Sequence, residues 1–351
     1  MQKTAKDIKV IRNLKILEVT EHYLLASRGY TVMKKSLPEG KWKKVAAIPE
    51  FTRRILAHSR LVARLLRLEI YFMKTLSDGT LLGIARKGLF RLRPGQNKFE
   101  KCFNISRGTR PMNFAEDEFG NIYFGEYFHN AERDKVHIYC SNDRGNSWRV
   151  AYTFEAGAIR HIHGIHYDSF TKRMWVTTGD LQNECIIGYS DDGFNSFTEV
   201  YRGGQEFRSC KLLFTENEIF YGTDSELEQN HLRVFNRESL QIINLTNVQG
   251  SVINATTGGE LLFFNTTVEP SAVNTDRHSY IWCVNPRTRQ AEVVQKFEKD
   301  KLDHRYFQFG QCYFPENKAE HNQTLYFSGC ALKSIDGHSI EMSLNHNFNK
   351  E

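Results

Sequence analysis

An eight-residue turn motif constrains the fold of this chain more than any other feature. Residues 141–148 read Ser-Asn-Asp-Arg-Gly-Asn-Ser-Trp. Asp143 can accept backbone N–H bonds inside a turn, Gly145 suits the positive φ that such a turn requires, and Trp148 can cover the turn from the following strand. The motif therefore predicts a tight β-hairpin at this point of the chain.

A degenerate copy of the motif follows 49 residues later. Residues 190–197 read Ser-Asp-Asp-Gly-Phe-Asn-Ser-Phe, so that Phe194 replaces the glycine and Phe197 replaces the tryptophan. A propeller blade takes about 40–50 residues, and the spacing therefore equals one structural repeat. Residues 334–339, Ser-Ile-Asp-Gly-His-Ser, form a weaker third copy.

Short apolar and aromatic segments separated by turns continue through most of the chain, in groups of four. A content of 13% aromatic residues suits such half-buried strands. The pattern predicts a single all-β domain over residues 1–351, a β-propeller with seven blades, with six as the alternative. The segment Ile8–Ile11 is expected to complete the short last blade and so to cover its exposed edge. The blades are expected at 17–48, 70–104, 111–154, 160–201, 209–245, 252–297 and 306–344.

One segment departs from the strand pattern. Residues Thr52–Leu68 carry five arginines together with apolar residues at helical spacing, which predicts an amphipathic helix with Thr52 as its N-cap. The favoured interpretation is a helix packed on the propeller with its arginines in solvent. The alternative is a peripheral contact with an anionic membrane surface or a partner.

Bulk properties narrow the classes of partner. The net charge of +6, without a continuous basic stripe, argues against nucleic acid. Seven cysteines with no CxxC spacing argue against a complete disulfide framework. Residues 1–15 lack the apolar run of a secretory signal, so the cytoplasm is the default location, with a periplasmic or secreted protein as the alternative.

Arginines and carboxylates recur at the same phase of successive blades. In a propeller, the loops before first strands and after second strands open on one face, so we expect these side chains to ring one mouth of the pore. Arginine binds carboxylates in bidentate fashion, which makes the mouth a candidate site for an acidic ligand. The arginines stand before first strands at Arg110, Arg160 and Arg208, and the carboxylates end second strands at Glu126, Asp180, Asp224 and Glu269.

Histidines crowd one predicted first strand. His161 and His163 share one face of the strand by period-two geometry. A metal ion with Glu126 as third ligand is one reading, but no spacing fixes that third ligand, and we expect no metal and no cofactor. The other readings are a histidine or Tyr127 as general acid or base, and a hydrogen-bonded lining of the pore.

The motif at 141–148 resembles the Asp-box of sialidase-like (BNR-repeat) β-propellers. Stretches 123–128 and 160–167 are also similar to bacterial Asp-box-repeat proteins described as glycosyl hydrolases and associated with polysaccharide metabolism. The resemblance implies a seven- or six-bladed propeller that binds or cleaves an acidic oligo- or polysaccharide, as a sialidase-like glycoside hydrolase or as a polysaccharide lyase. The alternative is a non-catalytic glycan-binding or scaffold propeller in polysaccharide assembly.

The resemblance also implies roles for the residues at the mouth. Sialidases combine an arginine cluster with a tyrosine nucleophile, a glutamate and an aspartate. The chain lacks the arginine-isoleucine-proline segment that sialidases carry near their start. The expected substrate-binding residues are Arg110, Arg160, Arg208 and His161, and the expected catalytic residues are Glu126, Tyr127, His163, Asp180, Asp224 and Glu269.

Overall fold

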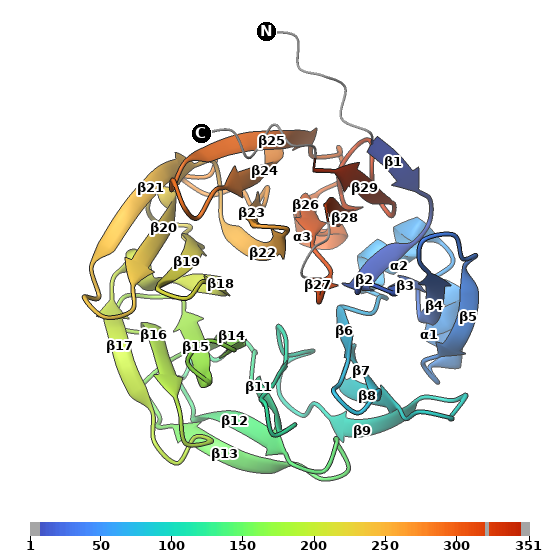
Figure 1. The fold of residues 1–351 in the computed structure, drawn as a ribbon, viewed down its shortest axis with the longest axis horizontal. Coiled ribbons are helices and arrows are strands. Elements are labelled where there is room, and N and C mark those ends of the chain that lie inside the picture. The colour runs from blue at the N-terminus through green and yellow to red at the C-terminus, as the bar shows by residue number, and fades with distance from the viewer. Residues whose placement is uncertain (1–7, 320–322, 345–351) are drawn as a thin grey trace, which may run out of the picture. The chain divides into compact units, whose positions relative to one another are not determined.

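The computed structural model describes residues 8–319 and 323–344 (Figure 1). Its described strands form seven small sheets, six with four strands and one with five, and the only other regular elements in these ranges are three short α-helices and one 3₁₀ turn. The fold is the all-β, seven-bladed propeller that the sequence predicted. Residues 1–7, which contribute to the expectation of no secretory signal, lie outside the described residues.

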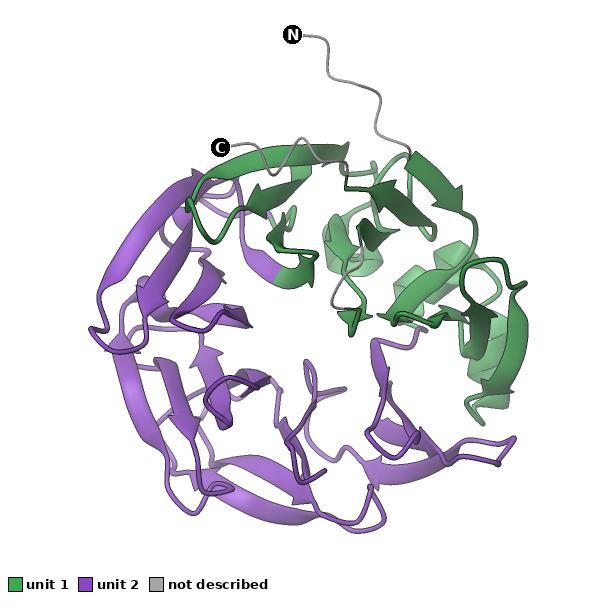
Figure 2. Ribbon diagram, viewed as in Figure 1, with its two compact units in different colours: residues 1–68, 254–269, 276–351 green, residues 69–253, 270–275 purple. Residues whose placement is uncertain are grey.

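The chain divides into two compact units (Figure 2). Unit 1 consists of residues 1–68, 254–269 and 276–351, and unit 2 consists of residues 69–253 and 270–275. Each unit is described by itself.

The first sheet of unit 1 contains the segment predicted as the first blade. Its strands follow the order β27-β2-β3-β4-β5, with β27 parallel to β2. Their bounds are β2 (Lys15–Val19), β3 (Tyr23–Arg28), β4 (Thr31–Ser36), β5 (Lys43–Ala47) and β27 (Glu316–Asn317).

The second sheet of unit 1 joins the first strand of the chain to the last ones, in the order β1-β29-β28-β26. Ile8 pairs with Met342 and Ile11 with Ser339, in antiparallel register. The prediction that Ile8–Ile11 completes the last blade is therefore confirmed. The strands are β1 (Ile8–Ile11), β26 (Gln311–Tyr313), β28 (Thr324–Cys330) and β29 (Ser339–Ser343).

The third sheet of unit 1 has the simple order β22-β23-β24-β25, and its first strand begins at the end of unit 2. The strands are β22 (Val252–Gly258), β23 (Leu261–Thr266), β24 (His278–Val284) and β25 (Ala291–Glu298).

The predicted helix at 52–68 is two short helices, α1 (Phe51–Leu56) and α2 (Arg60–Leu66). The hydroxyl of Ser59 accepts a hydrogen bond from the backbone N–H of Val62 and so begins a second helix, whereas Thr52 lies inside α1 and is not a cap. A third helix, α3 (His304–Phe307), completes the set. None of the helices in the described ranges has the length and apolar character required to cross a bilayer.

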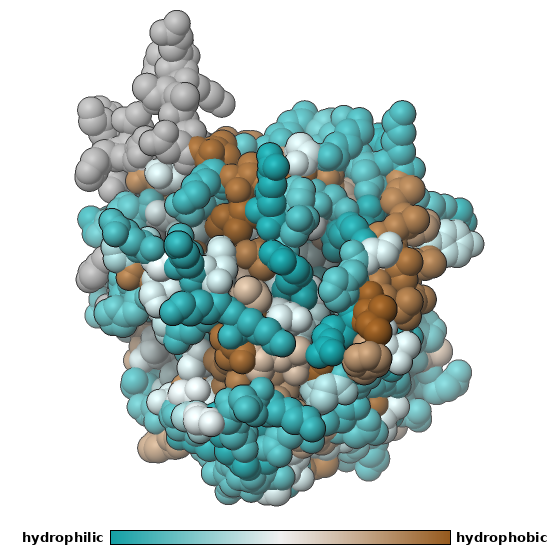
Figure 3. All heavy atoms as spheres, turned by 90° about the vertical axis from the view of Figure 1, so that its right-hand side faces the viewer, coloured by the Kyte–Doolittle hydropathy of each residue, from teal (hydrophilic) through white to brown (hydrophobic). Residues whose placement is uncertain are grey.

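These two helices depart from the favoured interpretation of the sequence at one arginine, Arg64, whereas Arg60 and Arg67 are exposed. The side chain of Arg64 is only 3% exposed and pairs with Asp300 and Asp336, and Arg60 also pairs with Asp336. The apolar side chains Leu61 and Leu65 are instead exposed. Apolar residues are visible among hydrophilic ones on the side of unit 1 that carries α1 and α2 (Figure 3).

Unit 2 contains four sheets, each made of four strands in consecutive order. The first two have the strands β6 (Phe72–Thr75), β7 (Leu81–Ala85), β8 (Gly88–Leu92), β9 (Glu100–Asn104), β10 (Ala115–Glu116), β11 (Ile122–Gly125), β12 (Val136–Ser141) and β13 (Arg149–Phe154). The next two have β14 (His161–Asp168), β15 (Arg173–Gly179), β16 (Cys185–Ser190), β17 (Thr198–Gly203), β18 (Ser209–Phe214), β19 (Glu218–Thr223), β20 (Asn230–Asn236) and β21 (Ile242–Val248), with a 3₁₀ turn at Gln205–Phe207.

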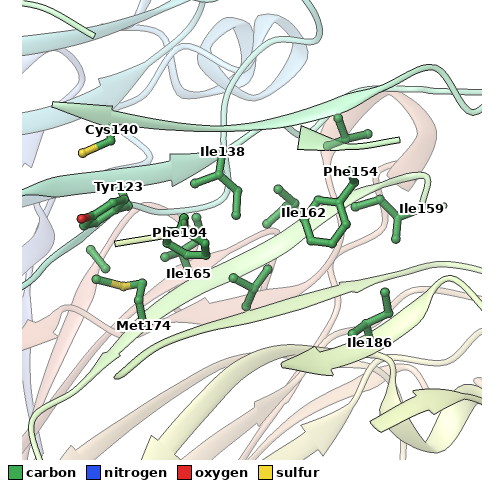
Figure 4. Close-up of a cluster of buried hydrophobic side chains, with 13 residues drawn as sticks. Tyr123, Ile138, Cys140, Phe154, Ile159, Ile162, Ile165, Met174, Ile186 and Phe194 are labelled. Atoms are coloured by element: carbon green, nitrogen blue, oxygen red, sulfur yellow. The ribbon is translucent and has the colours of Figure 1, made fainter. Parts of the chain in front are cut away.

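The core of unit 2 is formed between neighbouring sheets. In one cluster, Ile138 and Phe154 of one sheet pack with Ile162 and Ile186 of the next (Figure 4). Burial of these side chains contributes roughly 1.5–3 kcal/mol each, which makes the contacts between sheets the main source of stability here.

The turn at 141–148 forms as its sequence predicted. Asp143 accepts hydrogen bonds from the backbone N–H of Ser147 (2.9 Å) and from the hydroxyl groups of Ser141 and Ser147, and Gly145 has a φ of +79°. Trp148 packs edge-on against Phe103 and Phe124 but is only half-buried, less than its expected role as a cover implied.

The degenerate copy forms the same turn. Asp192 accepts from the backbone N–H and the hydroxyl of Ser196, and Phe194 adopts a φ of +70° where the motif has glycine. The ring of Phe194 is buried in the core cluster, which offsets the unfavourable backbone conformation. The third copy does not form this turn, because Asp336 accepts from the backbone N–H of Ala331 and pairs with Arg60.

Candidate functional site

The loops that carry the candidate residues open at the end of the sheet opposite to the turn of Asp143. In the pairing of β11 with β12, Ile122 lies opposite Ser141 and Gly125 lies opposite Ile138. Glu126 follows one end of this ladder and Asp143 follows the other. The predicted separation of the two loop types is confirmed for this sheet.

A β-bulge shapes the strand that carries the histidines. In the pairing of β14 with β15, Ile162 lies opposite Thr178 and Gly164 lies opposite Thr177, so His163 is the extra residue. The side chains of His161 and His163 are buried, and their Nε2 atoms lie 3.0 Å apart. The Nδ1 atom of His161 lies 3.0 Å from the carbonyl oxygen of Phe128.

Asp180, directly after β15, joins the histidines to two arginines. Its Oδ1 lies 3.3 Å from Nε2 of His161 and 3.0 Å from Nε2 of His163. The amide group of Gln205 donates to the backbone carbonyl of Asp180 (2.8 Å) and so fixes the loop. Asp180 is thus the centre of the cluster.

Arg160 and Arg208 share this one carboxylate. Arg160 donates to Oδ2 of Asp180 (2.8 Å) and to Nδ1 of His129 (2.7 Å). Arg208 lies 3.2 Å from Oδ1 of Asp180 and 3.6 Å from Asp224. The Nε atoms of Arg160 and Arg208 are buried and have no hydrogen-bond partner among the described residues.

The charges of the cluster fix its protonation. Burial alone raises the pKa of Asp180, but its contacts with His161 and His163 outweigh this and leave the pKa far below its usual value. Burial lowers the pKa of His161, which favours the neutral imidazole. Burial also lowers the pKa of Arg208, but the charges of Asp224 and Asp180 raise it above the usual value. Asp180 is therefore a fixed anion and Arg208 a fixed cation.

Tyr127 covers the histidine pair. Its ring centroid lies 4.3 Å from that of His161 and 6.2 Å from that of His163. Burial, together with the negative groups nearby, raises the pKa of Tyr127 well above its usual value, so the phenol keeps its proton. The charge of Arg110 opposes this shift, which places its guanidinium near Tyr127.

Arg110 is not tied to a carboxylate in the described parts of the chain. Its guanidinium lies 4.1 Å above the ring of Tyr71, and its nearest polar contact is the sulfur of Met112 at 3.8 Å. Together with Tyr127, it lines a small pocket. The three predicted arginines therefore differ: two share Asp180, and the third stands beside Tyr127.

The predicted carboxylate Glu126 has partners other than the histidines. Glu126 is buried and accepts hydrogen bonds from Arg107 (Nε, 3.0 Å) and from the backbone N–H of His137 (2.9 Å). The reading in which Glu126 is the third ligand beside the histidine pair is wrong, because Asp180 occupies that position. The predicted carboxylate Glu269 is half-buried in the loop after β23, in unit 1.

Two groups of side chains bring atoms of metal-ligand type within 4.8 Å of one another. They are His161, His163 and Asp180, and the overlapping set His163, Cys210 and Asp224. Sequence reasoning missed Cys210, which stands two residues after Arg208, whereas the histidines stand one and three residues after Arg160. It also missed Arg107, which lies in an irregular loop without a repeat position.

Comparison with known proteins supports the fold. No family model matches the chain, and no curated protein matches it. Among solved structures, an oligogalacturonate lyase in complex with manganese has a TM-score of 0.63 at 9% identity, covering 98% of this chain and 92% of that chain. A chain of the mitotic checkpoint complex has a TM-score of 0.58 at 9% identity, covering 97% and 94%.

A third similar structure is the extracellular domain of a one-component system protein from B. thetaiotaomicron. It has a TM-score of 0.58 at 10% identity and covers 97% of this chain but 42% of that chain. At such identities the similarity shows the propeller fold alone.

Proposed function

We propose that the protein binds an acidic oligo- or polysaccharide at this cluster and cleaves it by β-elimination. The observation that carries the proposal is the pair of guanidinium groups, Arg160 and Arg208, beside a tyrosine that keeps its proton. Their buried Nε–H groups make no hydrogen bond within the described residues, and Nε of Arg208 has only the longer ion pair with Asp224 at 3.6 Å. Unpaired buried donors are costly, and a sugar carboxylate would satisfy them.

Elimination fits these side chains better than hydrolysis does. A glycosidase needs a carboxyl group that can give up a proton, and a sialidase pairs its tyrosine with a glutamate. Here Asp180 is held as an anion, and Glu126 pairs with Arg107 while Tyr127 stacks on His161. In elimination, arginine neutralises the uronate carboxylate, and the carboxylate of Asp224, 3.6 Å from Arg208, takes the proton from the carbon next to the uronate carboxylate. The C–O bond to the leaving group then breaks, and Tyr127 gives its proton to the leaving oxygen.

A test begins with binding and then measures turnover. Acidic glycans that the protein binds on an array are incubated with it, and oligogalacturonate, the substrate named for one of the similar structures, is a first compound to assay. Elimination yields an unsaturated product that absorbs ultraviolet light, whereas the product of hydrolysis has no such double bond and does not absorb there. Binding without any product would instead support the second candidate, a non-catalytic glycan-binding propeller.

Arg160→Ala tests the carboxylate contact itself. We expect it to weaken binding of an acidic glycan by on the order of 2–5 kcal/mol, because it removes a charge-assisted contact. Arg173→Ala is the matched control, since Arg173 lies in the same sheet and pairs with Asp191 near the surface. Equal binding by wild type and Arg160→Ala, with the protein folded, would contradict the proposal.

A further inference from the structure

The geometry of His161, His163 and Asp180 points to a divalent metal ion held by this chain, and we propose that these three residues are its ligands. The inference does not depend on the proposed glycan chemistry. It replaces the role of His163 as a base, expected from the sequence, with a role as a ligand.

The spacing of the three ligand atoms fits a single metal ion. Nε2 of His161, Nε2 of His163 and Oδ1 of Asp180 are separated by 3.0, 3.3 and 3.0 Å. Metal–ligand bonds of about 2.0–2.2 Å place neighbouring ligands about 2.9 Å apart in octahedral and about 3.4 Å apart in tetrahedral coordination. The triangle therefore has the size of one face of a coordination sphere, with further positions left open.

The placement of protons on the two histidines also favours a cation between them. Nδ1 of His161 faces the carbonyl oxygen of Phe128, which can only accept, so Nδ1 carries the proton of the neutral ring and Nε2 presents a lone pair. That lone pair faces the carboxylate oxygen of Asp180 and Nε2 of His163. A proton on His163 can serve only one of these two acceptors. A cation between the three atoms satisfies all of them, and the bond to Phe128 is the usual outer support of a metal-bound histidine.

The positive charges of the neighbouring arginines do not exclude a cation. Arg160 and Arg208 face three carboxylates, since Asp224 and Glu226 lie 3.6 and 3.9 Å from Arg208 in addition to Asp180. The arginine–carboxylate group as a whole therefore carries one excess negative charge. Two imidazoles and a carboxylate suit divalent Zn, Fe or Mn.

Metal binding is measured directly, without reference to activity. The chelator-treated, dialysed protein is titrated with Zn²⁺ and with Mn²⁺, using calorimetry, elemental analysis and the shift in melting temperature. We expect one ion per wild-type chain, and affinity at least 10-fold lower for His163→Gln and for Asp180→Asn. His137→Gln is the matched control, because His137 lies in the same unit and binds Thr153 outside the cluster.

Two results would overturn the metal proposal. If folded wild-type protein binds neither ion, the three residues are not a metal site, and glycan cleavage by the same protein would leave the proposed function standing. If His163→Gln, folded by circular dichroism, binds the ion as tightly as wild type, the ion sits elsewhere. A metal-loaded protein that binds no acidic glycan would contradict the proposed function alone.

A different observation carries a second inference, on unit 1. We infer that α1 and α2 form a surface that binds an anionic lipid bilayer. Phe51, Ile55, Leu61 and Leu65 are 67%, 54%, 53% and 46% exposed, whereas Arg64 is buried against Asp300. Exposed apolar side chains gathered on consecutive helices mark an interaction surface.

Charge selects the lipid surface as the occupant. Residues 51–68 contain five arginines and no acidic residue. Three of these arginines, Arg53, Arg60 and Arg64, pair with carboxylates outside the segment, and the local positive charge of the helices comes from the others. Arg54 lies beside the exposed ring of Phe51, with its guanidinium 5.5 Å from the ring centroid. Apolar side chains next to arginine are the combination that inserts into the interface of a bilayer with negative headgroups.

Sedimentation with vesicles tests this surface. We expect wild-type protein to bind vesicles of phosphatidylcholine with phosphatidylserine, and to be released by salt. The double variant Leu61→Glu with Leu65→Glu is expected to bind at least 10-fold less, while Phe170→Glu, at a residue 53% exposed in unit 2, leaves binding unchanged. Binding unaffected by the double variant, or a wild-type dimer that the same variant dissociates in light scattering, would overturn the inference.

Discussion

Tyr127 is expected to contribute to turnover but not to glycan binding. Its ring stacks on His161 and its phenol stays protonated, so it can supply a proton but is a poor base. We expect Tyr127→Phe to retain glycan binding and to lose roughly 10²–10⁴-fold in turnover. Steady-state and binding assays on the same preparation check this, with Tyr152→Phe as a control in the same unit. A variant with undiminished turnover would remove Tyr127 from the reaction.

His166 gives the fold a dependence on pH. Complete burial, with a smaller contribution from Lys211, holds the pKa of His166 well below its ordinary value of 6.5. The unfolded chain therefore binds a proton that the folded chain does not, and stability falls as the pH drops below about 6.5. We expect the melting temperature to be constant above this pH and to decrease below it, with a smaller decrease in His166→Gln. Identical profiles for the two proteins would contradict this assignment.

At the scale of the element, the hairpin after β12 depends on the cover that Trp148 provides. The ring packs on Phe103 and Phe124 of the first two sheets of unit 2 but is half-buried. We therefore expect Trp148→Ala to cost about 2–3 kcal/mol, less than the 3–5 kcal/mol of a fully enclosed site. Denaturant unfolding measures the cost. Because the turn lies at the end of the sheet opposite to Glu126, ligand binding per folded molecule should not change.

Repeat phase predicted most of the elements and part of the site. Arg160 and Arg208 were expected together because residues at equivalent positions of successive blades become neighbours, and in the structure both contact Asp180. Glu126 stands at the equivalent position of its own blade, but its carboxylate binds Arg107 instead. Arg107 lies in an irregular loop, so the repeat pattern could not predict this contact. The break between α1 and α2 depends on one hydrogen bond from Val62 to Ser59, which helical spacing alone does not reveal.

At the scale of the whole molecule, the last sheet has its full set of four strands only because the first strand of the chain joins it. The pairing of β1 with β29 covers an edge that would otherwise present unpaired N–H and C=O groups. We expect deletion of residues 8–11 to lower solubility and to produce aggregates that bind thioflavin. Size-exclusion chromatography and dye binding check this outcome. A deletion variant that stays monomeric would show that β29 is protected by other means.

The same pairing determines when this sheet can fold during synthesis. β1 leaves the ribosome first, and its partner β29 is among the last strands to be made, so the earliest strand waits for nearly the whole chain. The strands of unit 2, by contrast, pair with close neighbours in sequence and can form as they emerge. Joining the two distant strands carries the largest loop-closure entropy in unit 1. We therefore expect the pairing of β1 with β29 to be the last step in completing this sheet.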